Sequence, residues 1–299
     1  MDNLGEILLN PKTSQQLETF LNRPSHGLLI SGSQGSGKKY TAGLLAAKLL
    51  GTTHEKLPNH PYFFKVAKDD GKAEISIDST RWLIKNLSLK VVSGSKQKNK
   101  IDRVAVVEDA GSMSIEAQNA LLKLLEEPPD GSLIILTAAT ESSLLPTVAS
   151  RTQKITVGPV TLDSSLKFFG NQYAKPEIET AWRLSQGSGG LMRALLSQSS
   201  AHPLKQAVDQ AKQMLRLKTY ERTMFLQGIS KDRAAFLLFL NGLSKVLAAL
   251  NESSIKNGRL ANTAKLLQAR RLVEDELKSA GANTNTRLLA LSLAINMPL

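Results

Sequence analysis

A glycine-rich loop near the start of the chain limits the possible folds more than any other feature. The apolar run Leu28–Ile30 leads into Gly32-Ser33-Gln34-Gly35-Ser36-Gly37-Lys38, and the helix-forming segment Tyr40–Leu50 follows. Between a strand and a helix, such glycines let backbone N–H groups face phosphate oxygens, and Lys38 reaches the terminal phosphates. The pattern predicts a P-loop, with a simple glycine-rich turn as the alternative. The residues assigned to this nucleotide site are Gly32, Gly35, Ser36, Gly37, Lys38 and Lys39.

The residue after Lys38 departs from the motif. P-loop nucleoside triphosphatases place Ser or Thr there, and its hydroxyl ligates Mg²⁺. This chain has Lys39, whose ammonium cannot ligate a cation, and Thr41 lies too far round the helix to substitute. The sequence therefore leaves ATP binding open and puts the placement of Mg²⁺ in question.

Two acids follow the apolar run Val104–Val107, in the order Glu108 and Asp109. In P-loop ATPases the acid at this strand end holds Mg²⁺, and the next one, usually a glutamate, polarises the attacking water. Here the order of Asp and Glu is reversed, so Glu108 can still reach a metal, whereas Asp109 is short for the water. We treat the two as a degenerate catalytic pair, with mere capping of the sheet edge as the alternative.

A second apolar run, Leu133–Leu136, is followed by small residues where a polar side chain normally helps to position water. Ala138 and Ala139 stand there. Together with Lys39 and Asp109, Ala139 makes three catalytic positions that deviate at once. We therefore expect weak or absent ATP hydrolysis, and whether the chain is an enzyme in its own right stays open.

Two arginines are candidates for contact with nucleotide phosphates. Arg151, in Ser150-Arg151-Thr152, is placed to project across a subunit interface and stabilise charge on a neighbour's γ-phosphate, as an arginine finger supplied in trans. Its alternative role is a surface ion pair. Arg193 opens a later helical segment. It is either a contact for nucleotide bound to the same chain or a solvated helix residue.

Strand and helix patterns divide the chain into three predicted parts. Residues 1–157 alternate apolar strands with helical segments, which predicts an α/β domain with a largely parallel sheet, and Asp78 is a predicted helix N-cap within it. Strand patterns end after Gly158-Pro159, so we expect a small helical lid over 158–202 and an all-helical domain over 203–299. The predicted strands are Leu28–Ile30, Tyr62–Val66, Val104–Val107, Leu133–Leu136 and Lys154–Val157.

Composition excludes several classes of protein. The chain has no cysteine, so disulfides and cysteine-ligated zinc are excluded, and no zinc is expected. It has no apolar run of roughly 18 residues and no apolar signal core at its start, which predicts a cytoplasmic protein without a membrane span. The net charge of +12 fits nucleic acid, an anionic membrane surface or an acidic partner. Ser93–Lys100 is predicted to be an exposed loop.

Two segments of the chain resemble bacterial clamp-loader subunits of the AAA+ superfamily. The first is Asn119-Ala120-Leu121-Leu122-Lys123-Leu124-Leu125-Glu126-Glu127-Pro128-Pro129, and the second is Ser150-Arg151-Thr152. The first segment is similar to that family's signature helix, and the second to its Ser-Arg-Cys motif with Thr in place of Cys. The degraded catalytic positions resemble the delta-prime type within this family, whereas Arg193 resembles the nucleotide-sensing arginine of active subunits. The resemblance implies an AAA+ RecA-like α/β domain, a helical lid and a helical collar that mediates oligomerisation.

The resemblance also implies a function. The chain is expected to be a subunit of the DNA polymerase III clamp loader, a hetero-pentamer that opens a sliding clamp and loads it onto primed DNA during replication. Its expected partners are the other loader subunits, the clamp and, through the assembled complex, DNA, with no membrane. In that complex Arg151 would complete a neighbour's ATP site. The alternatives are an active gamma/tau-like ATPase subunit, a stand-alone P-loop enzyme such as a nucleotide kinase, and a basic DNA-binding protein.

Overall fold

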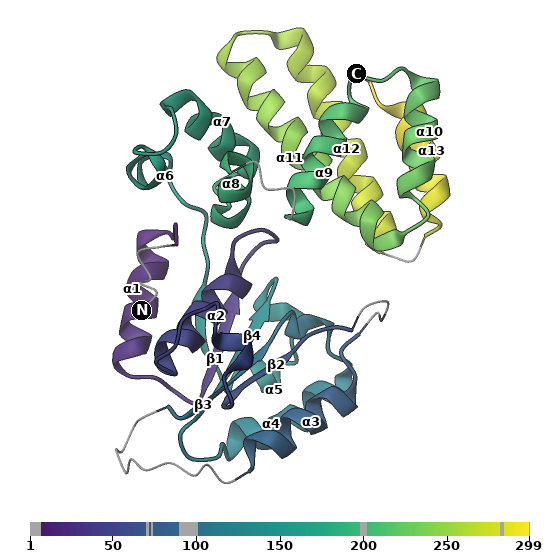
Figure 1. The fold of residues 1–299 in the computed structure, drawn as a ribbon. Helices are drawn as coiled ribbons and strands as arrows, with labels where there is room; N and C mark the ends of the chain where they lie inside the picture. Colours follow the sequence, from purple (N-terminus) through teal and green to yellow (C-terminus); the bar gives the residue numbers. More distant parts are fainter. Residues whose placement is uncertain are drawn as a thin grey trace. The chain divides into compact units, whose positions relative to one another are not determined.

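The computed structural model describes residues 7–69, 72, 74–89, 101–197, 202–281 and 284–298. They belong to two compact units, Met1–Ser164 and Ser165–Leu299, each of which is treated by itself below (Figure 1). The loop predicted at Ser93–Lys100 lies outside the described residues. The division of the helical part into a lid and a collar stays a prediction.

The first unit is built on a five-stranded parallel sheet with the strand order β2-β3-β4-β1-β5. All five predicted strands are present, with ends shifted by one or two residues. Strands β3 and β4 are buried along their whole length, as expected for central strands covered by helices on both faces. The bounds are β1 Gly27–Ser31, β2 Phe63–Val66, β3 Arg103–Val107, β4 Ser132–Ala138 and β5 Gln153–Thr156.

Alternate residues of the central strands point to opposite faces of the sheet, and each face has its own core. Val104 and Val106 pack on the face covered by helices α1 and α2. Ala105 and Val107 pack on the other face, which is covered by α3 and α4, two helices that lie side by side in Figure 1. The helix bounds are α1 Pro11–Asn22, α2 Lys38–Leu49, α3 Ile77–Leu87 and α4 Ile115–Glu126.

The prediction that Asp78 caps α3 is wrong, because the cap is Ser76. The Ser76 hydroxyl accepts a hydrogen bond from the backbone N–H of Ser79 at 3.4 Å. Asp78 lies in the first turn, where its charge favours the positive end of the helix dipole, and it faces Arg81 at 3.6 Å. Both serine and aspartate are common near helix starts, so the sequence pattern alone did not separate the cap from the first turn.

In the part of the second unit that the structure describes, all regular elements are helices, as predicted. Helix α11 is long and apolar enough to cross a membrane by length and composition alone. Its residues Phe236, Phe239 and Leu243 are fully buried in the core of this unit, which accounts for its hydropathy. The bounds are α6 Leu162–Phe169, α7 Lys175–Ser185, α8 Gly189–Leu196, α9 Pro203–Met214, α10 Thr219–Ile229, α11 Arg233–Lys256, α12 Leu260–Gly281 and α13 Thr286–Asn296.

Helices α9 and α11 approach each other closely at Gly242. A Cβ atom placed on Gly242 would lie 2.6 Å from the carbonyl carbon of Ala207 and 2.8 Å from its Cβ. These distances are shorter than any ordinary carbon–carbon contact, and backbone atoms cannot move aside as a flexible side chain can. Glycine at this position therefore sets the separation of the two helices.

Candidate functional site

The glycine-rich loop connects β1 to α2 with the backbone geometry that the sequence predicts. Gly35 and Gly37 have φ angles of 82° and 92°, a region that is costly for residues with a Cβ atom. Gly37 is the N-cap of α2, which has no side-chain cap bond and no acid in its first turn. The first backbone N–H groups of α2 are thus available to an anion, and the helix dipole favours one there.

Lys38 lies over this loop. Its Nζ donates to the carbonyl oxygen of Ser33 at 3.3 Å. Burial lowers the pKa of the Lys38 ammonium below its ordinary value, while the nearby charge of Asp109 acts in the opposite direction. Thr41 cannot replace the missing motif hydroxyl, because its side chain is fully buried and its Oγ1 donates to the carbonyl oxygen of Gly37 at 3.0 Å. The Lys38 ammonium therefore lies close enough to the Asp109 carboxylate for their charges to interact.

Two lysines form ion pairs with the carboxylate of Glu108. The Nζ of Lys39 lies 3.2 Å from its Oε2, and the Nζ of Lys65, from strand β2, lies 2.8 Å from its Oε1. Burial alone would raise the pKa of Glu108, but the hydrogen bond from Lys65 and the charge of Lys39 outweigh it and hold the pKa below its usual range. Both oxygens of Glu108, the acid assigned to Mg²⁺, are thus bound to ammonium groups, so Glu108 in this arrangement does not fit the metal.

The second acid sits in an uncommon backbone conformation. Asp109 has φ 57° and ψ 51°, the left-handed region that is costly for a residue with a side chain. Its N–H donates to the hydroxyl of Thr137 at 2.9 Å, and Thr137 is fully buried in β4. A polar residue is usual where Ala138 and Ala139 stand, and the sequence pattern did not single out Thr137, one position earlier. This hydroxyl is bound to the Asp109 backbone.

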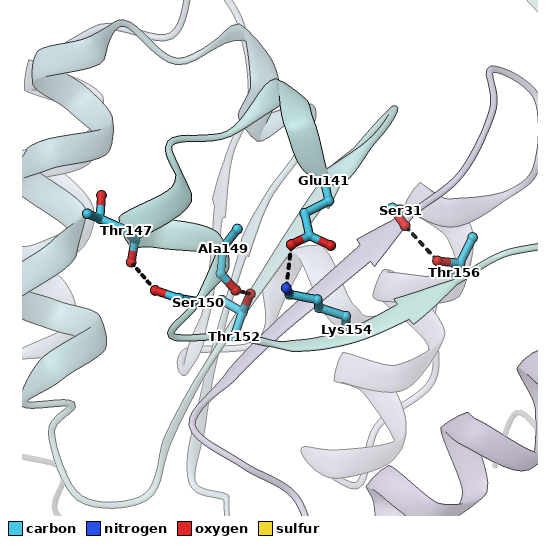
Figure 2. A network of polar contacts seen from close by, with 8 residues as sticks. All are labelled: Ser31, Glu141, Thr147, Ala149, Ser150, Thr152, Lys154 and Thr156. Carbon is cyan, nitrogen blue, oxygen red and sulfur yellow. Dashed lines mark hydrogen bonds and ion pairs between the residues drawn. The ribbon is translucent and has the colours of Figure 1, made fainter.

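Arg151 projects from a turn that its two neighbours stabilise. The Ser150 hydroxyl donates to the Thr147 carbonyl at 3.1 Å, and the Thr152 hydroxyl donates to the Ala149 carbonyl at 3.0 Å (Figure 2). The guanidinium of Arg151 donates to the Thr147 carbonyl at 3.0 Å, and its Nη2 lies 2.6 Å from Oε1 of Glu126. Its side chain is 37% exposed, so the predicted finger is bonded within the chain and still in contact with solvent.

Helix α4 supports this turn through a buried residue that the sequence analysis did not single out. Gln118 is 5% exposed. Its Nε2 donates to the Met113 carbonyl at 3.3 Å, and its Oε1 accepts from the Leu145 N–H at 2.8 Å. Leu145 is the N-cap of α5 (Pro146–Ala149), the short helix that leads to Arg151. Gln118 thus fixes α5 from one end of α4, and Glu126 contacts Arg151 from the other.

Arg193 lies in the second unit, on the exposed side of α8. Its guanidinium carbon is 5.9 Å from the ring centroid of Phe168, a distance that allows a cation–π contact. The nucleotide contact assigned to Arg193 stays a prediction. Among the described residues, no three His, Asp or Glu side chains gather as a metal site.

A P-loop after β1 of a parallel sheet, acids at the end of β3, which β4 separates from β1, and a following all-helical unit define an AAA+-type P-loop protein. The solved structure of a DNA polymerase III, gamma subunit-related protein from Thermotoga maritima is similar, with a TM-score of 0.54 over 95% of this chain and 100% of that one. At 18% sequence identity this likeness supports the fold alone.

Residues 9–161 match the family described as DNA polymerase III, delta subunit, and the chain belongs to that family. The delta′ subunit of DNA polymerase III from Pseudomonas aeruginosa is 30% identical over 42% of this chain and 41% of its own length. The Escherichia coli delta′ subunit is 27% identical over 58% and 55%. The gamma/tau subunit from Mycobacterium tuberculosis is 31% identical over 44% and 24%. The chain thus matches at most about half the length of these relatives.

Proposed function

We propose that this chain is a delta-prime-type subunit of a DNA polymerase III clamp loader that hydrolyses little or no ATP itself. The observation that carries the second half of the proposal is the occupation of Glu108 by Lys39 and Lys65. With Glu108 paired to two lysines and no motif hydroxyl after Lys38, the site lacks the two groups that hold Mg²⁺ in P-loop ATPases. The first half is supported by the family and by the relatives named delta′.

In the proposed complex, Arg151 stabilises the transition-state charge on a nucleotide bound to the neighbouring subunit. An arginine suits this role because its guanidinium is planar, always charged and able to form two parallel hydrogen bonds. The turn that holds Arg151 has three bonds of its own, from Ser150, Thr152 and the guanidinium. Little side-chain entropy would be lost when this arginine meets a phosphate.

The remaining partners follow from the same proposal. The helical part over residues 203–299 would join the collar of a hetero-pentamer, and the complex would load the sliding clamp onto primed DNA in the cytoplasm. The net charge of +12 is compatible with a position close to DNA in the complex. An active gamma/tau-like motor subunit is the second candidate. Relatives with that name and the P-loop Lys38 favour it, whereas the Lys39–Glu108 pair opposes it.

The test measures ATP hydrolysis by the purified chain, alone and mixed with the other loader subunits. We expect no hydrolysis alone, and hydrolysis in the mixture that falls with Arg151→Ala. Loss of a finger lowers the rate about 10³-fold or more at the site it serves, diluted by the other sites. Arg81→Ala, which removes an exposed arginine of the same unit, is the matched control.

Two results would reject the proposal. One is an unchanged rate with Arg151→Ala in a complex shown by gel filtration to be fully assembled. The other is strong hydrolysis by the chain alone that disappears with Lys38→Ala, which would make it a motor subunit.

A further inference from the structure

We infer that the P-loop of this chain binds the phosphate chain of a nucleotide without a divalent metal ion, using lysine side chains in place of the metal. The inference goes beyond the proposed function, which requires no nucleotide on this chain. It concerns Lys38, Lys39 and Lys65, and it is independent of what Arg151 does for a neighbour.

The first observation is an unsatisfied hydroxyl inside the loop. Ser36 is 5% exposed, and its Oγ has no hydrogen-bond partner among the described residues. The hydroxyl is turned toward the loop backbone, since a Cβ atom on Gly32 would lie 2.8 Å from it. Buried hydroxyls are almost always bonded, because leaving one unpaired is costly. A phosphate oxygen held by the loop would supply the missing partner once the hydroxyl rotated away from Gly32.

The second observation is the open end of α2 beside this hydroxyl. Gly37 caps the helix without a side-chain bond, and the first turn contains the two cations Lys38 and Lys39 rather than an acid. Like charges at a helix N-terminus are unfavourable on their own, since the dipole already places partial positive charge there. A polyanion would relieve this repulsion.

The third observation explains why the nucleotide phosphates would bind without a divalent metal ion. Glu108 accepts ion pairs from Lys39 at 3.2 Å and Lys65 at 2.8 Å, and its side chain is only 17% exposed. Mg²⁺ requires near-octahedral oxygen ligands at short distances. To bind here it would have to displace both ammonium groups from the carboxylate and then remain beside them. The fixed positive charges make that exchange unfavourable.

The charges around the loop also favour binding of a nucleotide without a metal ion. Three lysines and two carboxylates, Glu108 and Asp109, give this cluster a net charge of +1 before the helix dipole is added. A bound metal ion normally offsets part of the charge of a nucleotide phosphate chain. In this chain side chains already do so, and metal-free nucleotide carries more negative charge than its Mg²⁺ complex. Free nucleotide is therefore the better ligand.

The experiment uses the purified full chain and fluorescently labelled ADP and ATP, titrated by anisotropy in excess EDTA and in excess MgCl₂. We expect binding in EDTA that is as tight as in MgCl₂ or tighter, and displacement by unlabelled pyrophosphate. Lys38→Ala should weaken binding about tenfold or more, which corresponds to about 1.4 kcal/mol. Lys48→Ala removes an exposed lysine from the last turn of the same helix, and it should leave the affinity unchanged.

A double variant reverses the metal dependence. Lys39→Thr with Lys65→Met restores the motif hydroxyl and frees both oxygens of Glu108. Its nucleotide affinity should rise about tenfold on adding MgCl₂, and it should bind Mn²⁺ in the presence of ADP, as detected by electron paramagnetic resonance. The original chain should bind no Mn²⁺ under the same conditions.

The comparison of EDTA with MgCl₂ on the unmodified chain does not depend on any variant folding. Nucleotide binding that weakens about tenfold or more in EDTA would overturn the inference, as would an absence of binding in both buffers. Mn²⁺ binding by the unmodified chain with ADP would overturn it too. None of these results bears on the effect of Arg151→Ala in the assembled complex, which tests the proposed finger separately. Mn²⁺ binding by the unmodified chain would, in addition, count against the proposal that it hydrolyses little or no ATP.

Discussion

Oε1 of Glu126 lies 2.6 Å from Nη2 of Arg151, which joins the last residue of α4 to the proposed finger. Both side chains are more than a third exposed. Ion pairs of this kind contribute about 1 kcal/mol or less to stability. The pair therefore matters more for where the guanidinium points than for whether the domain folds.

Replacing Glu126 with Gln tests that role. The amide keeps the shape but loses the charge, so Arg151 becomes less restricted, and we expect the ATPase kcat of the assembled complex to fall severalfold. The KM for ATP and the thermal midpoint of the chain should stay the same. Glu127→Gln, at the adjacent exposed position, is the control. Equal kinetics for both variants would show that Glu126 does not position the finger.

The bonds of Gln118 should stabilise the first unit. Gln118→Leu has a similar volume but leaves the Leu145 N–H and the Met113 carbonyl without their partner. An unsatisfied buried polar group costs about 1–3 kcal/mol, so urea unfolding should show a loss of that size. Asn119→Leu changes the exposed neighbour on the same helix and should cost much less. A Gln118→Leu chain as stable as the original would contradict the role assigned to these bonds.

Gly242 should tolerate no side chain. Gly242→Ala forces α9 and α11 apart at Ala207, and overpacking of this kind costs about 1–3 kcal/mol. Gly228→Ala, on the exposed surface of α10 with no heavy atom near the added Cβ, should be neutral or slightly stabilising. Calorimetry of the two variants separates helix propensity from packing, and equal midpoints would reject the packing argument.

Glu276 gives the second unit a pH dependence. It is 6% exposed on α12, and burial raises the pKa of its carboxyl, although a hydrogen bond with Ser292 partly opposes this. A raised pKa in the folded state means that ionisation destabilises the fold, so this cost grows as the pH rises from about 4 through the folded pKa. Glu276→Gln should therefore stabilise the chain by about 1 kcal/mol at neutral pH. The gain should vanish near pH 4, and a gain independent of pH would point to another cause.

The central strands of the sheet were predictable because β3 and β4 are short apolar runs buried along their whole length. The pairing around Glu108 was not. Lys39 and Glu108 each stood out in the sequence, but their contact with Lys65 depends on β2 lying beside β3, and strand order is absent from local patterns. In the sequence, Lys65 looks like any exposed lysine on an edge strand.

Two other residues escaped notice for similar reasons. Thr137 lies inside an apolar strand and gains its role only because the left-handed Asp109 turns its N–H toward it. Gln118 sits on a helix whose other polar side chains face solvent, so its burial depends on the path of the chain from Leu144 to Leu145. Ser150-Arg151-Thr152 could be singled out because it is a short contiguous motif, and its role as a finger stays a prediction.

Under the proposed function, the two lysines on Glu108 also place a metal site out of reach of any single substitution. A single change of Lys39 to Thr leaves Lys65 on one carboxylate oxygen, and a single change of Lys65 leaves the motif hydroxyl missing. Each of these substitutions alone removes one positive charge beside the loop and does not complete a set of metal ligands. Metal ligation at this loop would therefore require changes in two separate elements, α2 and β2, at the same time.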